Sequence, residues 1–202
     1  MPYARPNLEA MHSITCRSDI PRFLQAFGLN NRIAEIGVRY GYHLEQLLSC
    51  RPALAIGVDH YSAHGTPGGN DTGLDQEELN RIYRETTLRF LYRPEVRIIR
   101  ENSKEAARMF PRLWFDYVYV DADHTYEGCL ADLRNWWPRV RQGGFLGGHD
   151  YLFATAKDGV VFGVVEAVRD FLRELDMDEN SPEFHFTPQG YRSWMLCKVD
   201  GE

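Results

Sequence analysis

Cysteine is scarce in this sequence, and its cysteines form no compact pattern. The 202 residues contain four, and no CxxC pair occurs among them. The polar, proline-punctuated stretch at residues 1–7 does not resemble a signal peptide. These features predict reduced thiols and a cytoplasmic protein.

Long hydrophobic runs and an excess of positive charge are also missing. Arg, Asp or Gly interrupts the longest apolar stretches within about ten positions, short of the roughly 20 residues that a membrane helix needs. The 23 Lys and Arg residues face 29 Asp and Glu residues, and the net charge of −6 has the wrong sign for binding nucleic-acid phosphates. We therefore expect a small-molecule substrate, and neither a nucleic acid nor a membrane as partner.

The composition that remains is that of an ordinary globular domain. Hydrophobic residues make up 44 % and charged residues 26 % of the chain. No repeat or low-complexity segment divides it, so we expect an N-terminal extension with a helix at residues 1–30 and one domain at residues 31–202. Apolar residues of the extension would be exposed unless something covers them, and they could pack on a neighbouring subunit of a homo-oligomer; they are Tyr3, Leu8, Met11 and Ile14.

Short aliphatic runs alternate with segments of helical period from about Asn31 onward, which is typical of the α/β class. The pattern predicts a Rossmann-like, seven-stranded, mostly parallel sheet with helices on both faces. The run FDYVYV is apolar or aromatic at nearly every position, which predicts a central strand. The predicted strands are residues 32–36, 53–59, 95–100, 115–121, 144–148, 183–187 and 191–199, and helices are predicted at 42–50, 74–91 and 103–110, the last with Asn102 as N-cap and Glu105 as its reciprocal partner.

The first candidate site lies in IAEIGVRYG, which places Glu35, Gly37 and Gly41 across a strand-to-helix turn. Glycine lets the backbone approach a ligand, and the following helix presents its unpaired N–H groups. The spacing differs from the GxGxxG of dinucleotide binders, and no phosphate-binding lysine follows, so a P-loop is excluded. A tight turn without a ligand is the alternative.

An acidic residue, Asp59, ends the next predicted strand in IGVDHY. At the carboxyl edge of a parallel sheet such a side chain can bind both hydroxyls of a ribose. Together with the glycine turn, Asp59 predicts a nucleoside-bearing ligand; the alternative is a carboxylate that only caps a loop.

Two later strand ends also carry carboxylates, in Asp121 and in the pair His149 and Asp150. Carboxylates at neighbouring strand ends repel each other unless a cation lies between them, and a divalent ion is such a cation. Asp121 and Asp150 are therefore the predicted metal pair. His149 is a possible third ligand, although imidazole suits manganese, iron or zinc better than magnesium. In the alternative, Asp150 caps a loop and His149 packs below it.

Three stretches carry a family resemblance: EIGVRYG, VDHY and YVDADHTYEGCLADLRNWWPRVRQGGFLGGHDY. From about Asn31 to the C-terminus the chain resembles class I S-adenosylmethionine-dependent methyltransferases. It is most similar to the metal-dependent small-molecule O-methyltransferases, in a branch with macrocin-type O-methyltransferases and proteins labelled cephalosporin hydroxylases. The resemblance implies S-adenosylmethionine and a divalent metal, magnesium or manganese, as cofactors.

The resemblance also implies roles for individual residues. Asp121 would be shared between the cofactor and the metal. His124 stands where catechol-type members have a lysine base, and a pKa of about 6.5 suits imidazole to take a proton near neutral pH. Alternatively, His124 is a structural histidine bonded to Asp123 or Thr125. The remaining implied cofactor contacts are Glu35 with Gly37 and Gly41 at the methionine amino end, Asp59 at the ribose, and Asn102 or Ser103 at the adenine.

The predicted function is methyl transfer to a hydroxyl of a small molecule: a sugar, a polyol or a catechol-like compound. Two alternatives stay open. One is a metal-dependent hydroxylase that uses His124, His149 and Asp150 as a facial triad, and the other is a cofactor-binding protein without catalysis.

Several further residues are given structural interpretations. Loop or surface positions are expected for His43, His60 and His64, and core positions for Trp136, Trp137, Phe153 and Phe162, although the two phenylalanines could instead cover an acceptor. Residues 62–73 and 151–162 are expected to shape the acceptor pocket, the first as a mobile loop.

Overall fold

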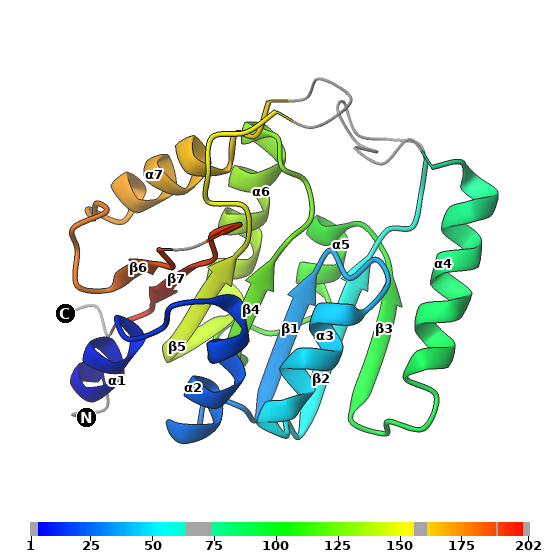
Figure 1. Cartoon of the computed structure of the whole chain (residues 1–202), viewed down its shortest axis with the longest axis horizontal. Helices are drawn as coiled ribbons and strands as arrows, with labels where there is room; N and C mark the ends of the chain where they lie inside the picture. The colour runs from blue at the N-terminus through cyan, green and yellow to red at the C-terminus, as the bar shows by residue number, and fades with distance from the viewer. Residues whose placement is uncertain (1–3, 64–73, 156–160, 189, 200–202) are drawn as a thin grey trace.

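The computed structural model describes residues 4–63, 74–155, 161–188 and 190–199, and a seven-stranded sheet runs through this part of the chain (Figure 1). The strand order is β3-β2-β1-β4-β5-β7-β6. β7 is antiparallel to β5 and β6, whereas the five preceding strands pair in parallel. The predicted fold class is therefore confirmed. The strands are β1 (Arg32–Ile36), β2 (Leu54–Asp59), β3 (Val96–Arg100), β4 (Phe115–Val120), β5 (Val140–Gly148), β6 (Phe184–Phe186) and β7 (Trp194–Cys197).

The central position of β4 follows from its side chains. All six residues of Phe115–Val120 are buried, because β1 and β5 flank the strand and helices cover both of its faces. The register pairs Ile36 with Val120, so β1 and β4 end side by side. The carboxyl ends of β1, β2, β4 and β5 therefore share one edge, at the top in Figure 1.

Helices cover both faces of the sheet. One face is covered by α1 (Ala4–Met11), η1 (Arg17–Asp19), α2 (Ile20–Ala26), α3 (Tyr42–Leu47) and η2 (Leu48–Cys50). The other is covered by α5 (Ser103–Arg108), α6 (Tyr126–Trp136), η3 (Trp137–Arg139) and α7 (Val164–Glu174), while α4 (Gln76–Arg89) lies beside β3 (Figure 1). The core interpretation is confirmed for Trp136, which is fully buried, and Trp137 packs partly buried against the same core. No helix in the described residues is long and apolar enough to cross a membrane.

The N-terminal segment packs on its own chain. Met11 is 0 % and Ile14 is 3 % exposed, both within the core that α2, α3 and the sheet form, and Leu8 is partly buried against it. Met11 and Ile14 are therefore covered by their own chain, and these two residues do not need a second copy to bury them. Tyr3 lies outside the described residues.

The start of α5 confirms one half of its predicted cap. Oδ1 of Asn102 accepts a hydrogen bond from the backbone N–H of Lys104 at 3.0 Å, as an N-cap does. Glu105, the expected reciprocal partner, instead pairs with Arg108 at 2.7 Å. The backbone N–H of Asn102 donates to Oε1 of Glu101 at 2.8 Å instead.

Candidate functional site

A cavity of about 540 Å³ opens at the carboxyl edge of the sheet. Seven predicted site residues line it: Glu35, Gly37, Asp59, Asn102, Ser103, Asp121 and His124. Three others do not line it directly, because Gly41 lies behind the first turn, and His149 and Asp150 lie beyond Asp121 and His124. The fold thus brings the ends of β1, β2, β3 and β4 together around one space.

The first turn depends on Gly37. Its φ is +92°, and a Cβ atom there would lie 1.9 Å from the backbone oxygen of Asp121, so only glycine fits. Gly41, with φ +78°, is the N-cap of α3. The motif therefore brings the ends of β1 and β4 into backbone contact beneath the cavity.

Glu35 is almost fully buried at the end of β1, and its partner is His43. His43 Nδ1 lies 3.1 Å from Glu35 Oε1, and the His43 ring packs 4.2 Å from that of Tyr119. Burial raises the pKa of Glu35 well above its usual value and lowers the pKa of His43 to about 3. The surface interpretation of His43 is therefore wrong: α3 directs this imidazole into the interior. His60 is exposed as expected, and His64 lies outside the described residues.

Asp59 organises the loops around the cavity. Its Oδ2 accepts the backbone N–H of Arg39 at 2.8 Å, and its Oδ1 accepts that of Tyr61 at 2.9 Å. Each carboxylate oxygen has a second lone pair, so ribose hydroxyls can still bind. Loop capping and ligand binding are compatible roles for this residue.

The side chain of Ser103 is already engaged. Its hydroxyl donates to Oδ1 of Asp132 and accepts from Nε1 of Trp136 at 2.8 Å. Burial, with the nearby charge of Asp123 adding and the bond from Ser103 opposing, raises the pKa of Asp132 to about 7. Asn102, Ser103 and Asp132 line this end of the cavity, together with Lys104 and Asn135.

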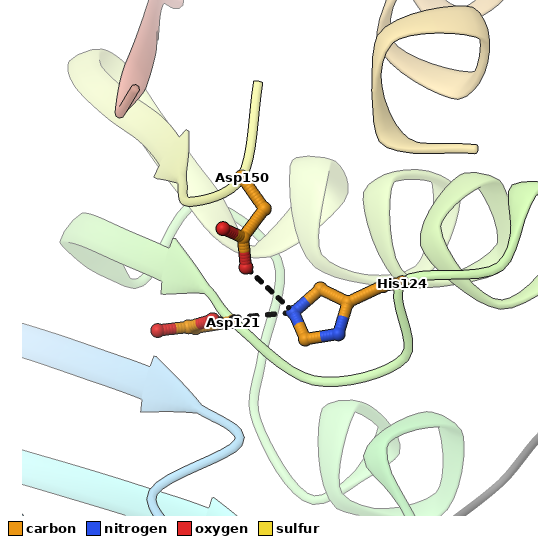
Figure 2. Close-up of side chains that lie close together, drawn as sticks. All are labelled: Asp121, His124 and Asp150. Atoms are coloured by element: carbon orange, nitrogen blue, oxygen red, sulfur yellow. Dashed lines mark hydrogen bonds and ion pairs between the residues drawn. The ribbon is translucent and has the colours of Figure 1, made fainter. Parts of the chain in front are cut away.

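Asp121, His124 and Asp150 point toward one another (Figure 2). His124 Nε2 lies 3.0 Å from Asp150 Oδ2 and 3.5 Å from Asp121 Oδ1. One ligand atom of each residue lies within 4.8 Å of the others. Asp150 is 6 % exposed, and its backbone has a φ of +53°. Burial raises its pKa, but hydrogen bonds with His124 and His149 outweigh this and hold the pKa below its usual value, so the carboxylate is ionised.

His149 lies beside this group. Its Nδ1 is 3.3 Å from Asp150 Oδ1 and 3.9 Å from Asp121 Oδ1, and its ring stacks on Tyr191 at 6.1 Å. Two carboxylates and an imidazole form a donor set that suits a divalent ion. Among the described residues, the imidazole that converges with the carboxylates of Asp121 and Asp150 is that of His124. His149 contacts the other carboxylate oxygen of Asp150, Oδ1.

The two phenylalanines near Asp150 differ in position. Phe162 stacks on His124, with ring centroids 4.8 Å apart, and lines the cavity. Phe153 is 67 % exposed, beneath Arg169. The core interpretation is therefore wrong for Phe153, whereas Phe162 is part of the cavity wall beside His124.

The decisive comparison is with protein families. A family model described as a methyltransferase domain matches residues 34–151, more than half of the chain. The chain belongs to this methyltransferase family. The family match and the seven-stranded sheet together support a class I S-adenosylmethionine-dependent methyltransferase. No curated protein matches the sequence.

Solved structures share the fold of this methyltransferase at low sequence identity. A Staphylococcus aureus protein assigned as a caffeoyl-CoA O-methyltransferase is 15 % identical (TM-score 0.62, 90 % of this chain and 82 % of that chain covered). An O-methyltransferase from Bacillus cereus in complex with S-adenosylhomocysteine is also 15 % identical (TM-score 0.60, 97 % and 89 % covered). A Clostridium thermocellum protein assigned as an rRNA methylase is 11 % identical (TM-score 0.63, 94 % and 98 % covered). These likenesses show the fold.

Arg17 and Asp132 line the methyltransferase cavity, and neither is among the site residues predicted from the sequence. Arg17 enters from η1, and its Nη1 lies 3.6 Å from Asp121 Oδ2. Asp132 enters from α6, where it looks like an ordinary helix-surface residue. A weak signal existed for Asp132, because i, i+4 spacing places it on the stripe of Gly128 and Trp136.

Proposed function

We propose that this methyltransferase transfers the methyl group of S-adenosylmethionine to a hydroxyl of a small molecule, with a divalent ion assisting. The convergence of Asp121, His124 and Asp150 beside the cofactor cavity carries the proposal. A group with two carboxylates and an imidazole has no role in binding the adenosyl part of the cofactor. It suits the acceptor, whose hydroxyl must be deprotonated and aimed at the methyl group.

The chain's own residues orient the cofactor. The Gly37 turn allows the backbone close to the ligand, and Asp59 can accept the ribose hydroxyls with the lone pairs that its loop bonds leave. Glu35 lines the cavity and would bind the positive amino end, whose charge favours the ionised form of this carboxyl against the burial that raises its pKa. Holding the two reactants in line supplies much of the catalysis for such a transfer.

Asp121, Asp150 and His124 would hold the metal. When bound, the ion supplies Lewis acidity and a template for the acceptor oxygen. The imidazole in the set favours manganese over magnesium. His149, the ligand expected from the sequence, would hold Asp150 in place through its contact with Oδ1.

His124 is the proposed base if the ion occupies the two carboxylates without it. Asp150 Oδ2, at 3.0 Å, orients the imidazole and stabilises its protonated form. The metal affinity of a His124 variant separates these two roles. If His124 is the base, its replacement leaves the metal affinity unchanged; if it is a ligand, its replacement lowers the metal affinity.

The acceptor is proposed to be a sugar, a polyol or a catechol-like compound. The net charge of −6 supports a small molecule over RNA, and Phe162 gives the cavity one flat apolar wall. The family match argues against the hydroxylase alternative. The group formed by Asp121, His124 and Asp150 argues against a protein that only binds the cofactor.

The test is calorimetric titration with S-adenosylhomocysteine, with and without manganese or magnesium, followed by methyl-transfer assays on hydroxylated acceptors. Micromolar binding that Asp59→Ala abolishes, together with methylated product, is the expected result. Absence of binding under every metal condition would overturn the proposal.

A further inference from the structure

The N-terminal segment before β1 is a built part of the cavity wall. Met11 and Ile14 are buried in the core, and Oδ2 of Asp19 accepts the backbone N–H groups of Thr15 and Cys16 at 3.0 and 3.2 Å. His185 Nε2 lies 2.8 Å from the backbone oxygen of Ile14. These contacts fix the backbone on both sides of residue 14, directly before η1.

The segment delivers one cation to the cavity. Arg17 lines it, with Nη1 3.6 Å from Asp121 Oδ2, and about one third of its side chain is exposed. Burial lowers the pKa of Arg17, but Tyr119, Asp121 and Glu35 outweigh burial and raise it, so the charge is permanent. The other lysine and arginine residues among the described lining residues are Arg39, which lies over Tyr40 at 5.2 Å, and Lys104, at the opposite end beside Asn102.

Near Arg17, whose charge opposes the effect of burial on the pKa of Glu35 and adds to that effect for His43, two buried polar atoms lack a hydrogen-bond partner in the described structure. They are Oε2 of Glu35, in a residue that is 2 % exposed, and Nε2 of His43, in a residue that is 6 % exposed. Both residues line the cavity. Buried polar atoms without partners are costly, and their presence in a cavity wall points to a polar ligand group that satisfies them.

This end of the cavity thus offers a guanidinium beside unsatisfied polar atoms and carboxylates. The amino-acid end of S-adenosylmethionine carries one carboxylate and one ammonium group, and only the carboxylate requires a cation. We propose that Arg17 binds the cofactor's carboxylate while Glu35, supported by His43, binds its ammonium group. The inference rests on the proposed cofactor and extends the site to a segment outside the residues that the family model matches.

The test compares two ligands on the full chain by calorimetry: S-adenosylhomocysteine and its decarboxylated analogue, which keeps the ammonium group. Arg17→Met should weaken S-adenosylhomocysteine binding about 10- to 100-fold, the usual effect of losing a charged hydrogen bond, and leave binding of the analogue unchanged. Arg17→Lys should keep part of the affinity. Arg22→Met, at an exposed arginine of α2, is the matched control and should bind both ligands as the unmodified chain does.

Equal binding of S-adenosylhomocysteine by Arg17→Met and Arg22→Met would overturn this inference and leave the proposed function standing. So would an equal loss for both ligands, because Arg17 would then support the cavity wall instead of contacting the carboxylate. Failure of the unmodified chain to bind S-adenosylhomocysteine would overturn the proposed function and the inference together.

Discussion

Nε2 of His124 lies 3.0 Å from Oδ2 of Asp150, and this contact joins the loop after β4 to the end of β5. The backbone positions both side chains. His124 lies directly before Thr125, the N-cap of α6, and Asp150 has a left-handed backbone conformation. The pair therefore presents an oriented imidazole and an ionised carboxylate next to Asp121, the group on which the proposed function rests.

Replacing Asp150 should separate chemistry from cofactor binding. We expect Asp150→Ala to reduce turnover by at least about 100-fold, since it removes the partner of His124 and a proposed metal ligand. The affinity for S-adenosylhomocysteine should survive, because Asp150 does not line the cavity. Turnover and calorimetric affinity are measured on the same preparation.

A matched control exists for that variant. Asp176 is exposed and also has a left-handed backbone, with φ +58° against +53° for Asp150. Asp176→Ala introduces comparable backbone strain away from the site and should leave turnover intact. Equal activity of the two variants would remove Asp150 from the mechanism.

Gly37 should tolerate no side chain. A Cβ atom at this position would meet the backbone of Asp121, whereas one at Gly28, with φ +64°, would meet nothing within 4 Å. Gly28→Ala should cost about 1 kcal/mol of unfolding free energy for the strained φ alone, and Gly37→Ala at least about 3 kcal/mol, since overpacking adds to the strain. Denaturant unfolding measures the loss of unfolding free energy in both variants. Equal losses would contradict the prediction, because the turn at Gly37 would then move to accommodate a side chain.

Asp132 should make stability depend on pH. Its pKa of about 7 in the folded protein lies above the unfolded value, so its contribution to stability is present below pH 4 and is lost as the pH rises to 7. Asp132→Asn does not titrate and can still accept from Ser103. The free energy of unfolding of the variant, relative to that of the unmodified chain, should therefore increase between pH 4 and 8, by up to about 4 kcal/mol.

Thermal unfolding across this pH range checks the effect of Asp132. Asp176→Asn, at an exposed position, is the control and should follow the unmodified chain at every pH. A difference between Asp132→Asn and the unmodified chain that stays constant with pH would contradict the assignment of the raised pKa.

The N-terminal segment should contribute to the stability of the single chain. Met11 is fully buried and Met109 is 62 % exposed. Met11→Ala should cost about 2–5 kcal/mol and Met109→Ala less than about 0.5 kcal/mol. If the loss in Met11→Ala instead depended on protein concentration, a second copy of the chain would take part in covering this residue.

Much of the fold followed from local pattern. Strand β1 has its predicted bounds, and β4 is central because a run without polar alternation must be buried on both faces. The carboxylates of Asp59, Asp121 and Asp150 were predictable for a related reason. Parallel strands place their carboxyl ends at one edge, so residues directly after those strands must come together there.

The tertiary structure alone decided which side chains complete the site. His43 looks like a polar residue on a short helix until α3 packs it against Tyr119 and Glu35, and Arg17 acquires its role only when η1 reaches Asp121. The choice between His124 and His149 as the converging imidazole was equally beyond the sequence. Periodicity reports which face of an element is buried, whereas these contacts join segments far apart in the chain, and their geometry depends on how whole elements pack.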